Sequence, residues 1–210
     1  MTSPSPVRRR SLLPLYAIMA ICLAPLVFAL AAYYLPSLGL RPAGQANYGH
    51  LIQPQRPVPD AAHLQLETLA GQPFDLQSLR GRWVLVNVDS GACSERCVRK
   101  LFILRNSHAS QGKNVDRISR VWFIDDDHEP STQIQQAYQG THMLKASSQQ
   151  LQAFLPGGTV LADTPGTQDL HAGMWVIDPN GNVMLVFPPD ADPLKVRRDI
   201  SKLLYNSRIG

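Results

Sequence analysis

Two cysteines are the residues of this chain best suited to chemistry. Cys93 and Cys97 lie in the run Ser-Gly-Ala-Cys-Ser-Glu-Arg-Cys. On a helix, positions i and i+4 share one face about one turn apart. Two thiols at that spacing can close a disulfide or bind one soft metal ion as thiolates, and sulfur ligands favour Cu(I) over hard cations. The third cysteine, Cys22, lies in an apolar N-terminal run and is interpreted as a packing residue.

The surroundings of the cysteine pair favour a reactive thiolate. The pair follows residues 83–88, an apolar run typical of a strand buried on both faces, and precedes a helical pattern. The positive end of that helix would stabilise a thiolate at Cys93. Arg96, Arg99 and Lys100 add positive charge on what we expect to be a solvated helix face. Ligand sites of α/β sheets lie at the carboxyl ends of strands, so the position also favours function.

The elements that must position the pair follow an alternating pattern. Strands are expected at residues 63–68, 83–88, 118–124, 174–177 and 183–187. Helices are expected after the cysteine pair, after Ser131, and after Ser147 or Ser148. In the first of these helices, Leu101 and Phe102 are predicted to face inward.

The clearest local signals lie near the C-terminus. The run Asp178-Pro179-Asn180-Gly181 matches a type I turn position by position and predicts a hairpin. Asp192 and Pro193 predict the cap and the first turn of the last helix. Its predicted inward face consists of Val196, Ile200, Leu203 and Leu204. The order of elements predicts an α/β fold with a mixed sheet, as in a thioredoxin-like domain.

The N-terminus carries a candidate membrane anchor. After a tail of residues 1–11, residues 12–35 hold no charge, and a helix needs about 20 residues to cross a bilayer. The three arginines at positions 8–10 precede this span, which predicts a cytoplasmic N-terminus and an exported remainder. A cleaved signal peptide is the alternative, because Ala29-Leu30-Ala31 resembles a cleavage site, but the apolar run exceeds the roughly 7–15 residues of a signal core. We expect a single-pass protein of the bacterial inner membrane with its domain in the oxidising periplasm.

The rest of the chain is predicted to comprise a linker and one domain. Residues 39–60 contain four prolines and three glycines, so we interpret residues 36–61 as a linker and residues 62–210 as the thioredoxin-like domain. The net charge is +4, and residues 8–10 supply three of those positive charges. No basic cluster is interleaved with aromatic residues, which excludes nucleic acid as a partner.

From about residue 64 to residue 204 the chain resembles the Sco family of copper-binding, thioredoxin-like proteins that assemble cytochrome c oxidase. The resemblance rests on the run 81–87 leading into a CxxxC pair, a strand ending in acidic residues, His171 before a strand, and the run 177–181. It implies that Cys93, Cys97 and His171 bind copper, as Cu(I) or Cu(II). It also implies that the family's acidic residue is Asp125 or Asp126. The prolines that usually flank Sco cysteines are absent, which marks a divergent member.

Three functions remain open at this stage. The first is a metallochaperone that passes copper to cytochrome c oxidase subunit II, a partner implied by the resemblance alone. The second is an enzyme, a thiol-disulfide oxidoreductase of exported proteins in which Cys93 attacks and Cys97 resolves. The third is an accessory protein of the oxidase that has lost its chemistry.

Overall fold

The computed structural model describes residues 12–35, 47–157, 169–207 and 209, in two compact units. The first unit, Met1–Ala46, contains helix α1 (Leu13–Tyr34). This helix has 22 residues, a mean hydropathy of 2.4 and no buried residue. Its length and composition are those of a membrane-spanning helix, although a signal sequence has the same properties. The predicted span of residues 12–35 agrees with it to one residue at each end.

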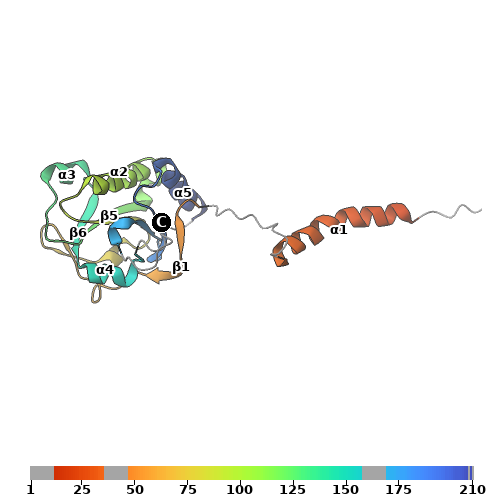
Figure 1. Cartoon of the computed structure of the whole chain (residues 1–210), viewed down its shortest axis with the longest axis horizontal. Helices are drawn as coiled ribbons and strands as arrows, with labels where there is room; N and C mark the ends of the chain where they lie inside the picture. Colours follow the sequence, from red (N-terminus) through yellow and green to blue (C-terminus); the bar gives the residue numbers. More distant parts are fainter. Residues whose placement is uncertain (1–11, 36–46, 158–168, 208, 210) are drawn as a thin grey trace, which may run out of the picture. The chain divides into compact units, whose positions relative to one another are not determined.

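The second unit, Asn47–Gly210, is built on a mixed sheet of eight strands (Figure 1). The strand order is β1-β8-β7-β4-β5-β6-β2-β3. The neighbours β4, β5 and β6 are parallel, whereas β7 runs antiparallel to β4, and β8 runs antiparallel to β7. The strands are β1 (His50–Pro57), β2 (Leu66–Thr68), β3 (Pro73–Phe74), β4 (Trp83–Asp89), β5 (Ile118–Ile124), β6 (Thr141–Ala146), β7 (Met174–Ile177) and β8 (Asn182–Phe187).

Helices cover both faces of this sheet, as predicted for the α/β class. Figure 1 shows α2 and α5 side by side on one face and α4 on the other. The α-helices are α2 (Glu95–Ala109), α3 (Thr132–Ala137), α4 (Ser148–Phe154) and α5 (Pro193–Asn206). Short 3₁₀ helices complete the fold: η2 (Leu76–Leu79), η3 (Gly112–Arg117) and η5 (Leu170–Ala172).

Strand β4 is the centre of the core, and all of its residues are buried. Successive side chains of a strand point to opposite faces of the sheet. Val84, Val86 and Val88 therefore pack with residues of α4, whereas Leu85 packs with residues of α2 and α5. Burial on both faces explains why the sequence of this strand is a nearly continuous apolar run.

The predicted turn and helix caps are confirmed. The Gly181 amide donates to the Asp178 carbonyl at 2.9 Å, which closes the turn between β7 and β8. Asp192 caps α5 by accepting from the Leu194 amide at 2.8 Å. Ser131 caps α3 in the same way, whereas Ser147 stands at the N-cap position of α4 but its side chain makes no capping hydrogen bond. The inward face of α5 has three buried residues and one that is partly buried: Val196, Ile200, Leu204 and Leu203.

The structure corrects three expectations. Residues 50–57, assigned to the linker, form β1 at the edge of the sheet, where prolines are tolerated because one side of the strand needs no partner. The compact unit accordingly begins at residue 47 instead of 62. Strand β6 was not predicted, because only one of its residues is fully buried. Phe102 is 51% exposed rather than inward, since α2 buries the neighbouring positions Leu101 and Ile103.

Candidate redox and metal site

The cysteine pair lies where β4 gives way to α2. Cys93 and Cys97 form a disulfide, with their Cα atoms 5.1 Å apart. Ser94 caps α2 and accepts from the Cys97 amide at 3.5 Å. The site therefore stands at the N-terminus of a 15-residue helix, where the aligned peptide dipoles stabilise negative charge on sulfur once the disulfide is reduced.

The two sulfurs have unequal surroundings. Cys97 is completely buried and packs with Trp122, Ile124 and Tyr138. Cys93 is half-buried and has a φ of 43°, in the left-handed region that non-glycine residues rarely adopt. That conformation costs roughly 1–2 kcal/mol. The pair thus has one residue that is partly exposed to solvent and one that is enclosed by apolar side chains.

Asp126 joins the loop after β5 to the loop that carries Cys93. Its carboxylate accepts from the Ser90 hydroxyl, from the Gly91 amide at 2.9 Å, and from His128 through the amide at 3.2 Å and the ring at 2.8 Å. Burial acts to raise the pKa of Asp126, but these hydrogen bonds outweigh it and lower the pKa to about 2. Asp126 is therefore ionised at neutral pH and fixes the backbone just before Cys93.

The depressed pKa of Asp126 predicts a pH-dependent stability. A carboxyl group with a lowered folded pKa stabilises the fold above its unfolded pKa of about 3.9, and loses that contribution as the pH falls through the folded value. We expect Asp126→Asn to lower the free energy of unfolding by about 1 kcal/mol at pH 7, after allowance for solvent screening. The difference from wild type should shrink between about pH 4 and pH 2. Urea unfolding curves of both chains across pH 2–7 measure this, and a pH-independent difference would contradict it.

His171 lies beside Asp125, at the end of β5. Its Nε2 is 3.0 Å from both carboxylate oxygens of Asp125, and its Nδ1 is 4.0 Å from Asp89 Oδ1. The hydrogen bond to Asp125 raises the pKa of His171, against an opposing effect of burial. For Asp125, burial raises the pKa, but the hydrogen bond and charge of His171 outweigh it, so the net shift is downward. The two acidic residues left open by the sequence thus have separate roles: Asp125 contacts the histidine, and Asp126 contacts the cysteine loop.

Lys100 and Asp89 were missed as site residues. Lys100 was expected on a solvated face, yet its side chain is 0% exposed and its Nζ lies 2.8 Å from Asp89 Oδ2. Burial lowers the pKa of Lys100, and Asp89 opposes that shift. A signal was present in the sequence, because position 100 falls within the stripe formed by Cys97, Leu101 and Leu104, which is otherwise apolar.

The three predicted metal ligands are only partly brought together. Cys93 and Cys97 are bonded to each other, and the described contacts of the His171 ring are to carboxylates. Within residues 12–35, 47–157, 169–207 and 209, no group of three His, Cys, Asp or Glu side chains is arranged to hold a metal ion. The donor types nevertheless suit copper, because reduction would provide two thiolates and His171 offers an imidazole nitrogen.

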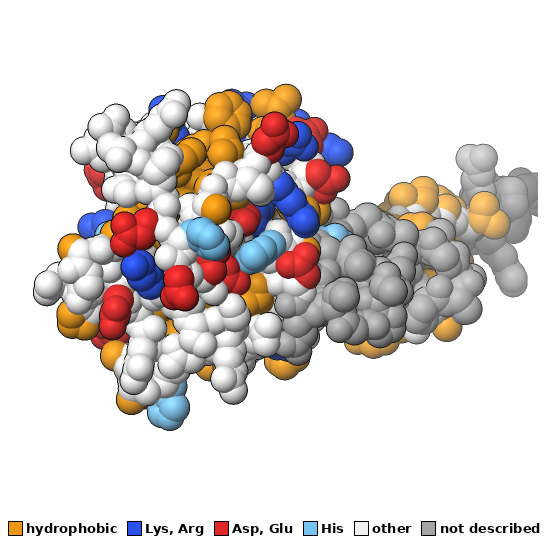
Figure 2. Space-filling view, turned by 60° about the vertical axis from the view of Figure 1, so that its left-hand side comes forward, with side chains coloured by type: hydrophobic (Ala, Val, Ile, Leu, Met, Phe, Trp, Pro, Cys, Tyr) orange, Lys and Arg blue, Asp and Glu red, His pale blue; other side chains and the backbone are white. Residues whose placement is uncertain are grey.

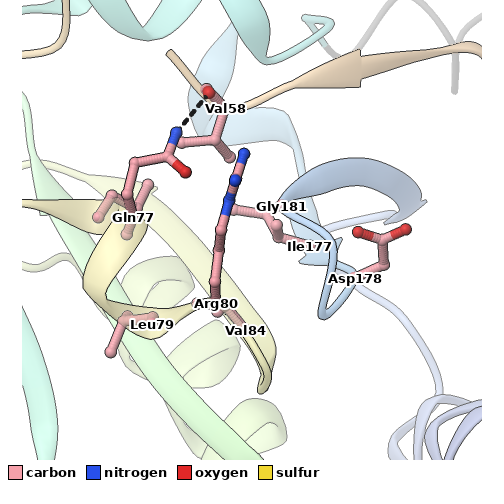
Figure 3. Close-up of a pocket in the computed structure, with 9 residues that line it drawn as sticks. Val58, Gln77, Leu79, Arg80, Val84, Ile177, Asp178 and Gly181 are labelled. Carbon is pink, nitrogen blue, oxygen red and sulfur yellow. Dashed lines mark hydrogen bonds between the residues drawn. The ribbon is translucent and has the colours of Figure 1, made fainter. Parts of the chain in front are cut away.

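The surface near this site is polar. Figure 2 shows acidic side chains gathered around histidines on one face of the domain. A groove there is lined by residues from β2, the end of β5, β6 and α4, including Glu67, Asp125, Asp126, Asp127 and Lys145. A separate cavity, near the start of β4, is lined by Val84, Ile177 and Gly181, with Arg80 alongside (Figure 3). Its volume of about 10 Å³ holds about one water molecule, so it is a packing gap.

Comparison with solved structures confirms the resemblance to Sco proteins at the level of the fold. Apo Sco1 from Thermus thermophilus is 19% identical, with a TM-score of 0.55 over 78% of this chain and 98% of that one. Yeast Sco1 with copper bound is 13% identical, with a TM-score of 0.52 over 78% and 96%. A SCO1/SenC family lipoprotein from Bacillus anthracis is 14% identical, with a TM-score of 0.52 over 72% and 98%. The thioredoxin-like fold predicted from the order of elements is thus confirmed.

Comparison by sequence gives the family. No curated protein matches the chain. Residues 83–207, which run from β4 beyond the end of α5, match the model of a family described as "Transmembrane-like, thioredoxin-like, C-terminal domain". This match covers more than half of the chain and includes both cysteines of the pair and His171. The chain therefore belongs to the family of transmembrane-like, thioredoxin-like C-terminal domains.

Proposed function

We propose that this chain is a membrane-anchored, Sco-like copper-handling protein. The observation that carries the proposal is the Cys93–Cys97 pair at the N-terminus of α2, at the carboxyl end of a buried strand. A solved structure of the same fold is that of yeast Sco1 with copper bound. Reduction of the disulfide would release two thiolates at the N-terminus of α2, one just before the helix and one in its first turn, and paired thiolates are preferred ligands of Cu(I).

His171 is the third ligand in this proposal. Histidines that bind metals commonly donate their other ring N–H to a carboxylate, which fixes the ring and raises its basicity. Asp125 stands in that relation to Nε2 of His171, and Nδ1 is then the atom left for copper. His128 stands in a similar relation to Asp126, whose carboxylate bonds the cysteine loop, so the choice of His171 also rests on the resemblance to Sco proteins and is tested against His128.

The placement and partner of the chain complete the proposal. Helix α1 anchors the chain in the bacterial inner membrane, and the arginines at positions 8–10 keep its N-terminus in the cytoplasm and the domain in the periplasm. The copper ion is cargo, and it passes to cytochrome c oxidase subunit II as donor atoms of that subunit replace Cys93, Cys97 and His171. The oxidation state of copper does not change in this exchange.

A titration tests this function. The full chain in detergent is reduced without oxygen and titrated with Cu(I) against a chromophoric Cu(I) chelator. We expect one tightly bound copper ion per chain, and none in Cys93→Ser/Cys97→Ser. If the wild type and the double variant withdraw equal amounts of Cu(I) from the chelator, copper handling at this site is refuted. Undiminished oxidase assembly in cells with the double variant would leave only the accessory role.

The unequal exposure of the two cysteines favours a second candidate, thiol-disulfide exchange. In this alternative the thiolate of Cys93, the more exposed residue, attacks a client disulfide and expels one client thiolate. The thiolate of buried Cys97 then attacks Cys93, restores the intrachain disulfide and releases the second client thiolate, so two electrons pass to the client. An external dithiol must reduce the chain again.

The reduction potential discriminates this candidate from a structural disulfide. Exchange proteins have potentials from roughly −120 to −270 mV, whereas structural disulfides lie below about −300 mV. We expect equilibration of the Cys93–Cys97 pair with glutathione or dithiothreitol buffers to give a potential within the exchange range. A value below −300 mV, combined with no effect of the double serine variant on client thiols, would exclude exchange.

A further inference from the structure

The side chain of Lys100 is the most deeply buried charge of the described domain. It is 0% exposed beneath α2, and its counterion Asp89 is 7% exposed. An unpaired ammonium in such a place is very unfavourable, and even a paired one is often no better for stability than apolar residues of similar size. The neighbouring buried positions of α2, Leu101, Ile103 and Leu104, show that this face accepts apolar side chains. Stability alone thus gives no reason for a lysine at this position.

The hydrogen bonds of Lys100 connect the parts of the candidate site. An ammonium group has three N–H donors. The Nζ of Lys100 donates to the Val88 carbonyl and to the His171 carbonyl, each at 2.9 Å, and forms an ion pair with Asp89 Oδ2 at 2.8 Å. Val88 and Asp89 end the strand before the cysteine loop, and Lys100 lies one helical turn after Cys97. One group therefore links β4, the cysteine-bearing helix and the backbone of His171.

Within the described residues, the segment that carries His171 is otherwise held by the buried side chain of Leu170, which packs in the core, and by local hydrogen bonds. η5 is only three residues long, and its local bonds are those of Asp169 to the amides of His171 and Ala172. The His171 ring meets Asp125 on one side, and Asp89 Oδ1 lies 4.0 Å from its other nitrogen. Asp89 thus faces the ring while its partner Lys100 holds the carbonyl of the same residue.

We propose that Lys100, supported by Asp89, is a positioning residue that holds His171 against the cysteine-bearing helix. It acts on the backbone of η5 and touches neither sulfur nor copper. This inference rests on the proposed function, because a fixed position of His171 is useful only if its imidazole joins the cysteines in binding a ligand. Residues that hold a metal-binding histidine typically change metal affinity by about 10–100-fold when replaced.

The test separates positioning from mere stability. Lys100→Met alone would leave Asp89 buried without a partner, so the variant of choice is Asp89→Asn/Lys100→Met, which removes both charges. The matched control is Glu129→Gln/Lys145→Met, which removes an exposed ion pair that also joins a lysine to a carboxylate. Each full chain is reduced in detergent, and the Cε1–H signal of His171 is recorded by NMR without copper, assigned through His171→Gln. Cu(I) affinity is measured on the same samples.

We expect the buried double variant to remain folded, with a broadened and shifted His171 signal and Cu(I) bound about tenfold more weakly. The control should match the wild type in both measurements. An unchanged His171 signal in the folded variant would overturn the positioning role. If the methionine variant does not fold, Asp89→Asn/Lys100→Gln replaces it; its amide has fewer donors than the ammonium, so an unchanged signal there also overturns the proposal. If replacing His171 leaves Cu(I) affinity unchanged, the proposed copper site is refuted. The NMR signal of His171 recorded without copper still decides the role of Lys100.

Discussion

Cys97→Ser is expected to weaken Cu(I) binding by the reduced chain on the order of a hundredfold, because a hydroxyl is a poor ligand for a soft ion and a thiolate is a good one. Cys97 is fully buried against Trp122 and Tyr138, so no other ligand from solvent can readily take its place. His171→Ala is expected to have a smaller effect, of roughly tenfold, because the two thiolates remain. Both affinities come from anaerobic competition with a chromophoric chelator.

A matched control accompanies the two ligand variants. His128→Ala removes an exposed histidine of the same face, one that bonds Asp126 rather than the cysteine-bearing helix. It should bind Cu(I) as the wild type does. If His171→Ala and His128→Ala behave alike, the site has no histidine ligand at position 171. If Cys97→Ser retains wild-type affinity, copper is held elsewhere on the chain.

Gly91→Ala is expected to destabilise the domain by about 3 kcal/mol, the upper end for overpacking, because a Cβ at this position would overlap the carbonyl oxygen and carbon of His128. Both partners of the overlap are backbone, so neither can turn away as a side chain would. The loop at residues 90–93 must move from the loop at residues 126–128. The hydrogen bonds that Ser90 and Gly91 donate to Asp126 are then lost, together with the close packing of the two loops.

Tryptophan fluorescence measures this loss in the full chain. All three tryptophans lie in strands of the domain, so urea unfolding followed in this way reports the domain without α1. Gly71→Ala is the control, because its φ of 72° penalises a side chain while no atom lies within 4 Å of the added Cβ. It should cost only about 1–2 kcal/mol. Equal losses in the two variants would show that the contact between the two loops does not constrain the domain.

The geometry of the candidate site depends on residues other than its two cysteines. The backbone before Cys93 is held by the carboxylate of Asp126, and Cys93 itself adopts a left-handed conformation. On the other side of β4, the backbone of His171 is held by Lys100. The geometry of the cysteine pair and of the histidine thus depends on three acidic residues, Asp89, Asp125 and Asp126, none of which is a proposed ligand.

The sequence by itself determined the parts of this protein whose causes are local. A charge-free run long enough to span a bilayer predicted α1, and a run of turn residues predicted the hairpin of β7 and β8. Asp192 followed by Pro193 predicted the start of α5. The burial of β4 and the spacing of Cys93 and Cys97 predicted a disulfide or metal pair at the end of a central strand. In each case a few adjacent residues contain all the information.

Only the tertiary structure decided which distant residues meet. The prolines of residues 50–57 indicated a linker, but this segment pairs with β8 and forms an edge strand. The sequence indicated a solvated charge at Lys100, but its helix face is buried against β4, where Lys100 pairs with Asp89. The different contacts of Asp125 and Asp126 also needed the fold, since these residues are adjacent in sequence but bond His171 and Gly91, respectively. These outcomes depend on long-range pairing and on the cost of burying charge, which no short sequence window encodes.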